Sequence, residues 1–246
     1  MTYNYDSRFM DYTAGSSRYS AHTIVAKIRQ ALPVASLLDI GCARGTWLDE
    51  WQKAGTADVF GVDGNYIKPD QLVIPAERFR AADLSQPIEL ERTFDLVQSL
   101  EVAEHVAATS ANTFVQNLVR HASGAILFSA APPGQGGEFH VNEQPYDYWR
   151  EKFRQHGYEA YDWVRPQIAS DKAISFWYRF NVILYLTAER AAGVTQDISS
   201  TKVSVTVPLA DISPLWFKAR KAAVRLLPFS MQQALARAKA RLTQTV

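Results

Sequence analysis

Residues 36–47, SLLDIGCARGTW, are the stretch that most constrains the fold of this chain. A strand-like apolar run ends at Ile40, glycines follow at Gly41 and Gly45, and an amphipathic helical pattern begins at Thr46. Short apolar runs bounded by glycine are typical of buried parallel strands, and glycine lets a tight turn take positive φ values. A helix that begins after such a turn directs its unbonded N–H groups at whatever lies over the loop. The stretch therefore predicts a nucleotide-type site between a strand and a helix.

Composition allows one full-sized domain. The chain has 246 residues, of which 47% are hydrophobic and 21% charged. It contains no apolar run of about 18 residues that could span a bilayer, and its first ten residues are too polar for a signal peptide. Cys42 is the single cysteine, which excludes an internal disulfide and a cysteine zinc site. We therefore expect a cytoplasmic protein.

The charges are distributed unevenly along the chain. No acid follows Asp211, whereas seven lysines and arginines do; because the whole chain carries +1, the residues up to Asp211 carry −6. An acidic body argues against broad nucleic-acid binding, so no nucleic-acid partner is expected.

Seven segments have the apolar pattern of strands, and helical patterns separate most of them. The strands are predicted near 34–40, 58–64, 78–87, 94–100, 124–133, 158–164 and 179–187, and the helices at 21–31, 46–54, 109–121 and 145–156. This alternation predicts an α/β fold, a Rossmann-like sheet of seven mostly parallel strands with helices on both faces. The long apolar alternation of the last strand favours an antiparallel edge hairpin. Residues 1–32 are predicted to form a lid and a helix, 33–189 the main domain, and 190–246 a linker and tail.

An acid precedes the glycine turn and sharpens the prediction. The run from Asp39 to Gly45, DIGCARG, resembles the first motif of class I S-adenosylmethionine (SAM) dependent methyltransferases, D-x-G-x-G-x-G, with Ala43 in place of the middle glycine. The resemblance implies that this loop wraps the methionine part of SAM, and that an N-terminal lid with Arg18 or Tyr19 touches the cofactor. Because some proteins of this fold have lost catalysis, Ala43 keeps open the alternative of an inactive binding protein.

Two further strand ends carry acids. Asp63 follows the glycine loop by about 20 residues, where an acid in a doubly wound sheet accepts hydrogen bonds from both ribose hydroxyls. The resemblance makes Asp83 the acceptor for the adenine amino group, with Leu84 beside the ring. The full predicted cofactor set is Asp39, Gly41, Cys42, Ala43, Gly45, Asp63, Gly64, Asp83, Leu84 and Ser99.

A cluster of carboxylates and histidines follows the fourth strand. If a helix begins at Glu101, then Glu101, Glu104 and His105 lie on one face of it. This E-x-x-E-H motif is similar to that of metal-dependent small-RNA 2′-O-methyltransferases and ubiquinone-pathway O-methyltransferases, in which two glutamates and two histidines hold a divalent ion. The resemblance adds His140 as the fourth ligand. Such a shell suits Mg²⁺, Mn²⁺, Fe²⁺ or Zn²⁺, which would bind neighbouring substrate hydroxyls and lower the pKa of the attacking one.

Two other interpretations of this cluster stay open. In a metal-free site His105 or His140 alone would take the proton as general base. Alternatively, both histidines are structural. In each catalytic interpretation His105 and His140 are the predicted catalytic residues, and the predicted reaction is O-methylation of a small molecule or glycan.

The residues after His140 combine amides and aromatic rings, which suit sugar hydroxyls and faces. This run resembles a stretch common in bacterial methyltransferases of glycan and natural-product pathways, and comprises Asn142, Glu143, Tyr146, Tyr148 and Trp149. The helical spacing of Trp149 and Phe153 favours a core role for both.

The tail is predicted to hold a possible strand at 202–207 and basic amphipathic helices within 214–243, divided by Pro228. Its apolar residues and seven positive charges suit a membrane surface, and peripheral contact with the inner face of a membrane is one prediction. A helix packed on the domain and a dimer arm are equally open alternatives.

Overall fold

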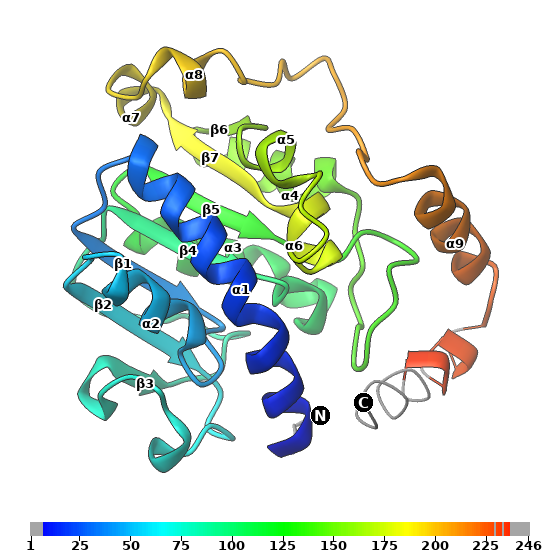
Figure 1. Cartoon of the computed structure of the whole chain (residues 1–246), viewed down its shortest axis with the longest axis horizontal. Helices are drawn as coiled ribbons and strands as arrows, with labels where there is room; N and C mark the ends of the chain where they lie inside the picture. The colour runs from blue at the N-terminus through cyan, green and yellow to red at the C-terminus, as the bar shows by residue number, and fades with distance from the viewer. Residues whose placement is uncertain (1–6, 229, 233, 237–246) are drawn as a thin grey trace.

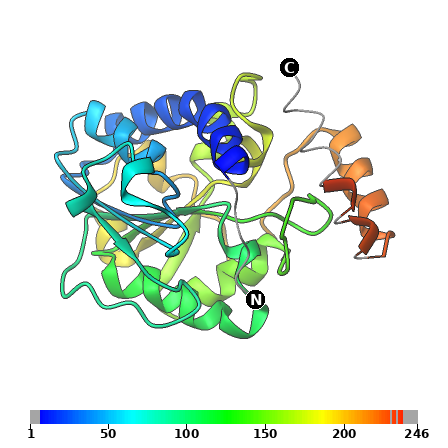
Figure 2. The same ribbon diagram turned by 90° about the horizontal axis from the view of Figure 1, so that it is seen from below.

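The computed structural model describes residues 7–228, 230–232 and 234–236 of the chain. Within these residues a single sheet forms the centre of the molecule, with helices on both faces (Figures 1 and 2). Its strands are β1 (Ser36–Ile40), β2 (Asp58–Asp63), β3 (Phe79–Ala81), β4 (Leu96–Leu100), β5 (Ala125–Ser129), β6 (Tyr158–Tyr161) and β7 (Ile183–Thr187). The predicted α/β sheet of seven strands is confirmed.

The strands lie in the order β3-β2-β1-β4-β5-β7-β6. The first five pair in parallel, with Ile40 opposite Val62, so the carboxyl ends of β1, β2 and β4 lie at one edge of the sheet. β7 is antiparallel to both β5 and β6, which confirms the predicted antiparallel pairing. The last strand is not at the edge of the sheet, however. The side chains from Ile183 to Leu186 are all buried, a pattern typical of an interior strand, and β6 takes the outer position.

Two apolar clusters hold the helices against the sheet. Trp51 of α2 and Val25 of α1 belong to the cluster on one face, whereas Phe114 of α3 and Trp149 of α4 belong to the cluster on the other. The helices are α1 (Ser7–Ala31), α2 (Thr46–Lys53), α3 (Ala111–His121), α4 (Tyr146–Arg154), α5 (Val164–Ile168), α6 (Phe176–Asn181), α7 (Ala188–Ala192), α8 (Gln196–Ser199) and α9 (Leu215–Arg225). In the described part of the chain no helix has the length and apolar character needed to cross a bilayer.

The N-terminal helix is longer than predicted. It begins at Ser7 rather than near residue 21, while residues 1–6 of the predicted lid lie outside the described residues. Polar contacts hold its middle part: Ser17 shares a hydrogen bond with the Tyr178 hydroxyl at 2.9 Å, and Ser20 Oγ accepts one from the Ser175 amide at 3.0 Å. Because serines rather than apolar residues make these contacts, apolar periodicity did not reveal this part of the helix.

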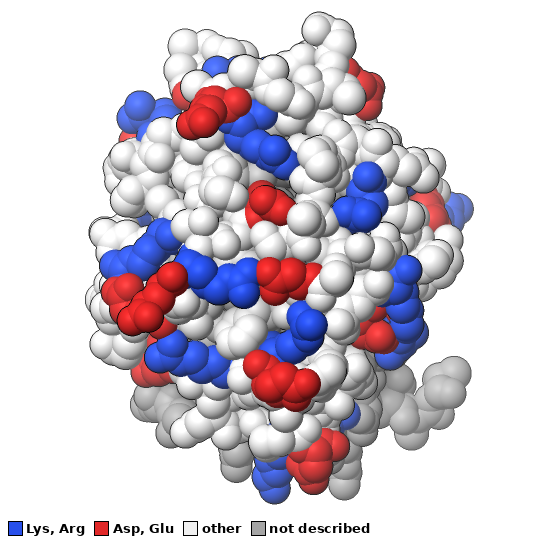
Figure 3. All heavy atoms as spheres, turned by 90° about the vertical axis from the view of Figure 1, so that its left-hand side faces the viewer, with Lys and Arg blue, Asp and Glu red and all other residues white. Residues whose placement is uncertain are grey.

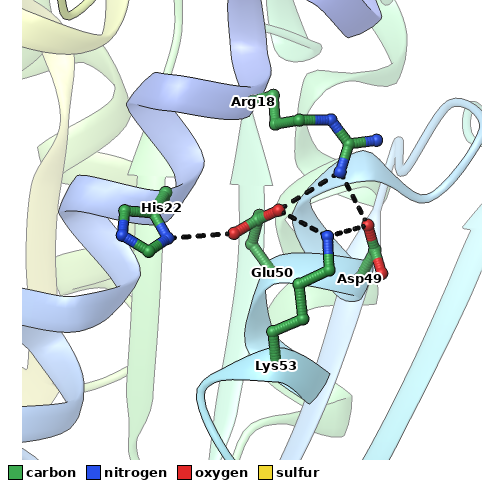
Figure 4. A network of polar contacts seen from close by, with 5 residues as sticks. All are labelled: Arg18, His22, Asp49, Glu50 and Lys53. Carbon is green, nitrogen blue, oxygen red and sulfur yellow. Dashed lines mark hydrogen bonds and ion pairs between the residues drawn. The ribbon is translucent and has the colours of Figure 1, made fainter.

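A cluster of charged side chains joins α1 to α2 (Figure 4). Glu50 is buried on α2, and its carboxylate accepts from Arg18 Nη1 at 3.2 Å and Lys53 Nζ at 2.9 Å and lies 3.2 Å from His22 Nδ1. Burial of Glu50 favours its neutral form, but the hydrogen bonds from Lys53 and His22 outweigh burial and lower the pKa of Glu50. Arg18 thus anchors α1 to α2.

Two predicted strand regions have other structures. Residues 179–181 belong to α6, where Phe176 and Phe180, four residues apart, both place their rings against Phe217; this spacing suits one face of a helix and not of a strand. The predicted strand at 202–207 forms only one bridge, between Lys202 and Tyr161. The Arg150 guanidinium donates to the carbonyl oxygens of residues 204, 205 and 207, in place of a neighbouring strand.

The tail forms α9 on the side of the molecule away from β3, at the end of an extended segment that follows α8 (Figure 1). Residues 230–232 and 234–236 beyond Pro228 are helical too. Three of the predicted basic residues, Arg237, Lys239 and Arg241, lie outside the described residues. On the face drawn in Figure 3, basic and acidic side chains are interspersed among the described residues rather than segregated by sign.

Candidate functional site

The glycine loop turns tightly between β1 and α2. Gly41 and Gly45 have φ values of 89° and 88°, and Ala43 has a φ of 49°. A Cβ on Gly41 would lie 2.3 Å from Cγ2 of Val102, so only glycine fits there. Ala43 holds the left-handed conformation without being glycine, which costs roughly 1 kcal/mol. The turn at 41–45 therefore has the geometry predicted from the sequence.

Asp63 ends β2 directly beside this loop. Its Oδ2 accepts a hydrogen bond from the Ala43 amide at 2.6 Å, and its Oδ1 accepts from the Gly64 amide at 2.6 Å and from the Tyr66 hydroxyl. Burial raises the pKa of Asp63, and these three donors oppose that rise. Asp63 thus fixes the loop, a role that the sequence did not reveal, and Tyr66 is a partner that the sequence analysis missed.

The remaining members of the predicted cofactor set divide into buried and exposed residues. Asp39, Cys42 and Ser99 are buried, and Ser99 Oγ has no hydrogen-bond partner among the described residues. Burial raises the pKa of Asp39 to about 7 and that of the Cys42 thiol well above its usual value. Asp83 is exposed and closes a turn by accepting from the Ser85 amide at 2.9 Å, and Leu84 beside it is half-buried.

Arg18 and Tyr19, predicted to touch the cofactor, contact other elements. Arg18 pairs with Asp49 and Glu50, and the exposed Tyr19 hydroxyl donates to Asp171 Oδ2 at 3.0 Å. A contact of Arg18 or Tyr19 with the cofactor stays a prediction.

The helix predicted to begin at Glu101 is absent. Glu101 has a φ of +57° and is followed by a single 3-10 turn, Ala103–His105, so the i, i+3, i+4 argument does not hold. The Glu101 carboxylate instead accepts from Gln135 Nε2 at 2.7 Å and Asn181 Nδ2 at 3.1 Å. Positive φ at a glutamate is uncommon and turns its side chain away from the direction that a helix would give it.

Three of the four predicted metal ligands nevertheless meet. Glu104, His105 and His140 each offer a ligand atom, and these atoms lie within 4.8 Å of one another. Glu104 is completely buried, and neither of its carboxylate oxygens has a hydrogen-bond partner among the described residues. Burial raises the pKa of Glu104 well above its usual value, and the nearby Glu101 adds to that rise; the backbone amides of Glu104 and Ala131, which form no regular hydrogen bond with this carboxylate, oppose it only in part. A buried carboxylate without a donor is costly unless a cation or a proton compensates it.

Glu143 orients the ring of His140. Its Oε1 lies 2.8 Å from His140 Nδ1, and its two oxygens also accept from the Gly134 and Gly136 amides, each at 2.7 Å. An ionised carboxylate only accepts, so Nδ1 of His140 donates to Glu143. The other ring nitrogen, Nε2, lies 4.0 Å from Oε1 of Glu104. Glu143 thus directs Nε2 of His140 toward Glu104.

His105 completes the cluster. Its ring centroid lies 4.9 Å from that of His140, with the two rings nearly perpendicular. Burial, followed by the charge of His140, lowers the pKa of His105 to about 3. The ring is therefore neutral at pH 7, the form that binds metal ions.

The residues present fit a divalent cation. One carboxylate and two imidazole nitrogens form a mixed oxygen and nitrogen donor set, and a second carboxylate that fixes one imidazole is typical around metal sites. Gly137 makes room for this arrangement, because a Cβ there would lie 2.0 Å from His140 Nε2. Glu101, the fourth predicted ligand, lies outside the cluster of three.

The other residues singled out after His140 have structural contacts. The Tyr146 hydroxyl donates to Asn181 Oδ1 at 2.8 Å, and Trp149 is buried in the core, as its spacing predicts. Asn142 is buried, and its Nδ2 has no partner among the described residues. Tyr148 packs against the apolar cluster on the face of the sheet that α3 and α4 cover.

Comparison with known proteins identifies the class. Residues 16–173 match the family described as "Methyltransferase domain", which covers more than half of the chain. The chain therefore belongs to this methyltransferase family, and its fold is that of the class I SAM-dependent methyltransferases, as predicted. None of the curated protein sequences compared with the chain matches it.

Several solved structures share the fold. A magnesium protoporphyrin IX methyltransferase from Synechocystis PCC 6803, solved with SAM, is 16% identical with a TM-score of 0.53, and the match covers 74% of this chain and 86% of that one. An amino pentose methyltransferase from Micromonospora echinaspora is 16% identical (TM-score 0.54), over 76% of this chain and 99% of that one. A sugar N-methyltransferase from Streptoalloteichus sp ATCC 53650 is 15% identical (TM-score 0.52), over 71% and 87% of the two chains.

Proposed function

We propose that this methyltransferase transfers a methyl group from SAM to a hydroxyl of a small molecule or glycan, assisted by a divalent metal ion. The observation that carries the proposal is Glu104: neither of its two buried oxygens has a hydrogen-bond partner among the described residues, and one of them lies 4.0 Å from Nε2 of His140. A divalent cation between these atoms would compensate the buried carboxylate.

The loop residues serve the cofactor. Gly41 to Gly45 bring bare backbone to the ligand, and Asp63 has one further lone pair on Oδ2, beyond the bond from Ala43, to accept a ribose hydroxyl. Asp83, Leu84 and Ser99 remain proposed contacts of the adenosine. The strand ends from which these side chains come lie at the same edge of the sheet as the turn that carries Glu104.

Glu104, His105 and His140 would hold the metal. When bound, such an ion supplies a Lewis acid that lowers the pKa of a substrate hydroxyl. Glu143 orients His140 through Nδ1, and loss of hydration lowers the pKa of the half-buried His105, so His105 stays neutral. Glu101, whose carboxylate accepts from Gln135 and Asn181, lies close enough to Glu104 to add negative charge beside this group.

A second candidate is metal-free methyl transfer in which His140 acts as general base. The hydrogen bond from His140 Nδ1 to Glu143 favours it, because a carboxylate in this position also stabilises the imidazolium that forms. Two of the structural relatives act on a sugar or an amino pentose, and one of them methylates nitrogen, so a sugar amine is the acceptor in this second candidate.

Metal binding decides between the two. We expect the metal-depleted protein to gain thermal stability with Mg²⁺, Mn²⁺ or Zn²⁺, and Glu104→Gln to lose that gain while still binding SAM. Glu101→Gln, outside the cluster, is the matched control and should keep most of the metal-induced shift.

Equal metal-induced shifts in the parent protein and Glu104→Gln would contradict the metal proposal. His140→Ala would then be the variant that abolishes turnover, and thorough chelation would leave the activity of the parent protein unchanged. Transfer of a radiolabelled methyl group from SAM into a cell extract, followed by identification of the product, would name the acceptor atom in either case. We propose the cytoplasm as the compartment, on composition alone.

A further inference from the structure

The helix α9 has one face fixed to the body of the protein. Phe217 is buried with its ring 4.8 Å from that of Phe176, and Lys221 is buried with Nζ 2.6 Å from Asp211 Oδ2. Arg220 donates to the carbonyl oxygen of Gln135 at 2.9 Å, and a Cβ on Gly134 would lie 2.2 Å from the Lys221 carbonyl oxygen. The inner face of α9 is therefore packed against the loop that leads to His140, and Figures 1 and 2 both show that loop reaching toward α9.

The outer face of α9 is apolar and exposed. Leu215 and Trp216 of α9, and Leu226 directly after it, which continues its helical conformation, are 82%, 64% and 87% exposed. Successive residues of a helix are rotated by about 100° around its axis, so these three side chains and several alanines lie on one continuous stripe about 120° wide. We call it the outer stripe. The outer stripe consists of Leu215, Trp216, Ala219, Ala222, Ala223 and Leu226.

Basic residues border the outer stripe on both sides. Lys218 and Arg225 project from one border, and Arg220 from the other. No acid occurs in the sequence after Asp211, so no negative charge from this segment opposes them. An exposed apolar stripe with flanking cations is complementary to a bilayer that carries anionic headgroups, where the apolar side chains enter the acyl boundary and the cations meet phosphates.

We propose that the outer stripe of α9 docks this methyltransferase onto an anionic membrane surface. The proposal goes beyond the chemistry proposed above and does not depend on it. Since Arg220 at the border of the stripe also bonds Gln135, the docked bilayer lies next to the loop that carries His140. The enzyme would therefore work beside amphiphilic acceptors in the membrane.

Cosedimentation of the full chain with vesicles tests the proposal. We expect binding to phosphatidylcholine vesicles that contain phosphatidylglycerol, little binding to pure phosphatidylcholine, and release by salt because the attraction is partly electrostatic. Lys218→Glu/Arg225→Glu should weaken binding by more than ten-fold, since each charge near the surface contributes about five-fold. The control Lys172→Glu/Lys202→Glu makes the same change in net charge at exposed sites outside α9 and should bind as the parent does.

The apolar part has its own variants. Trp216→Ser/Leu226→Ser should lose vesicle binding while retaining SAM affinity and the circular dichroism of the parent protein. Trp216→Phe should keep vesicle binding but lose the blue shift of tryptophan fluorescence that vesicles induce. Equal sedimentation of the parent protein and Trp216→Ser/Leu226→Ser would overturn the proposal. So would a dimer in analytical ultracentrifugation that this variant dissociates, because the outer stripe would then be covered by a second copy.

Discussion

The backbone amide of Ala43 donates a hydrogen bond of 2.6 Å to the carboxylate of Asp63, which joins the loop after β1 to the end of β2. Asp63 is buried at this point and has two further donors, the Gly64 amide and the Tyr66 hydroxyl. Asp63 therefore has two roles. Its carboxylate fixes the loop that we propose to bind the methionine end of SAM, and it is also the proposed acceptor for the ribose hydroxyls.

Asp63→Ala should weaken SAM binding by about 2–3 kcal/mol, the range for hydrogen bonds to a charged group. The variant also leaves the Ala43 amide without its acceptor, so both ends of the cofactor lose support. Isothermal titration with SAM measures the effect. Asp83→Ala, at an exposed strand end, is the comparison and should cost less. Unchanged SAM affinity in a folded Asp63→Ala protein would remove the ribose assignment.

Ala43→Gly should stabilise the protein by roughly 0.5–1 kcal/mol, because glycine adopts the left-handed conformation at φ 49° without strain. The greater conformational entropy that glycine gives the unfolded chain offsets part of this gain. Urea unfolding provides the measurement. Ala192→Gly, at the end of the regular helix α7, is the matched control and should be destabilising. A loss of stability in Ala43→Gly would show that the Ala43 methyl group packs usefully in the loop.

Asp39 should make the stability of the protein fall as the pH rises. Burial raises its pKa from 3.8 to about 7 in the folded state, so the folded form binds a proton that the unfolded form has released. The stabilising contribution of the protonated Asp39 to the free energy of unfolding is fully present below pH 4. It is lost as the pH rises from about 4 to 7, by up to about 1.4 kcal/mol per pH unit. Asp39→Asn removes the titration, so its stability relative to the parent protein should increase from pH 5 to pH 8 in urea unfolding. A difference that does not change with pH would refute the assignment.

Glu50→Gln should destabilise the contact between α1 and α2 by about 1–2 kcal/mol, because it weakens hydrogen bonds between charged groups at a buried site. The pKa of Glu50 is lowered in the folded state, so its contribution is present above the unfolded value of 4.5 and is lost as the pH falls further. Asp49→Asn, with a more exposed side chain, should cost less than 1 kcal/mol. Thermal unfolding at pH 7 and pH 4 would reveal the difference, and equal losses for both variants would argue against a special role for the buried carboxylate.

Much of the frame could be predicted from local patterns. Strand, glycine turn and helix at 36–53, and the acids Asp63 and Asp83 after two strands, follow from apolar periodicity and turn chemistry within a few residues. His140 was predicted only through a resemblance, and the structure brings it to Glu104 and His105. The strand, the turn, the helix and the two acids were accessible because each depends on residues close together in the sequence, whereas no local pattern indicated His140.

Tertiary packing decided the rest. Glu101 has a positive φ in place of the predicted helical one, and its carboxylate accepts from Gln135 and from Asn181, which lies 80 residues away. Glu143 orients His140 through Nδ1, and the Gly134 and Gly136 amides fix the same carboxylate. Phe176 and Phe180 of α6 meet Phe217 of α9, and the burial of one face of α9 leaves the other face as an exposed apolar stripe. No local pattern encodes such contacts, because their free energy depends on side chains that meet only after the chain has folded.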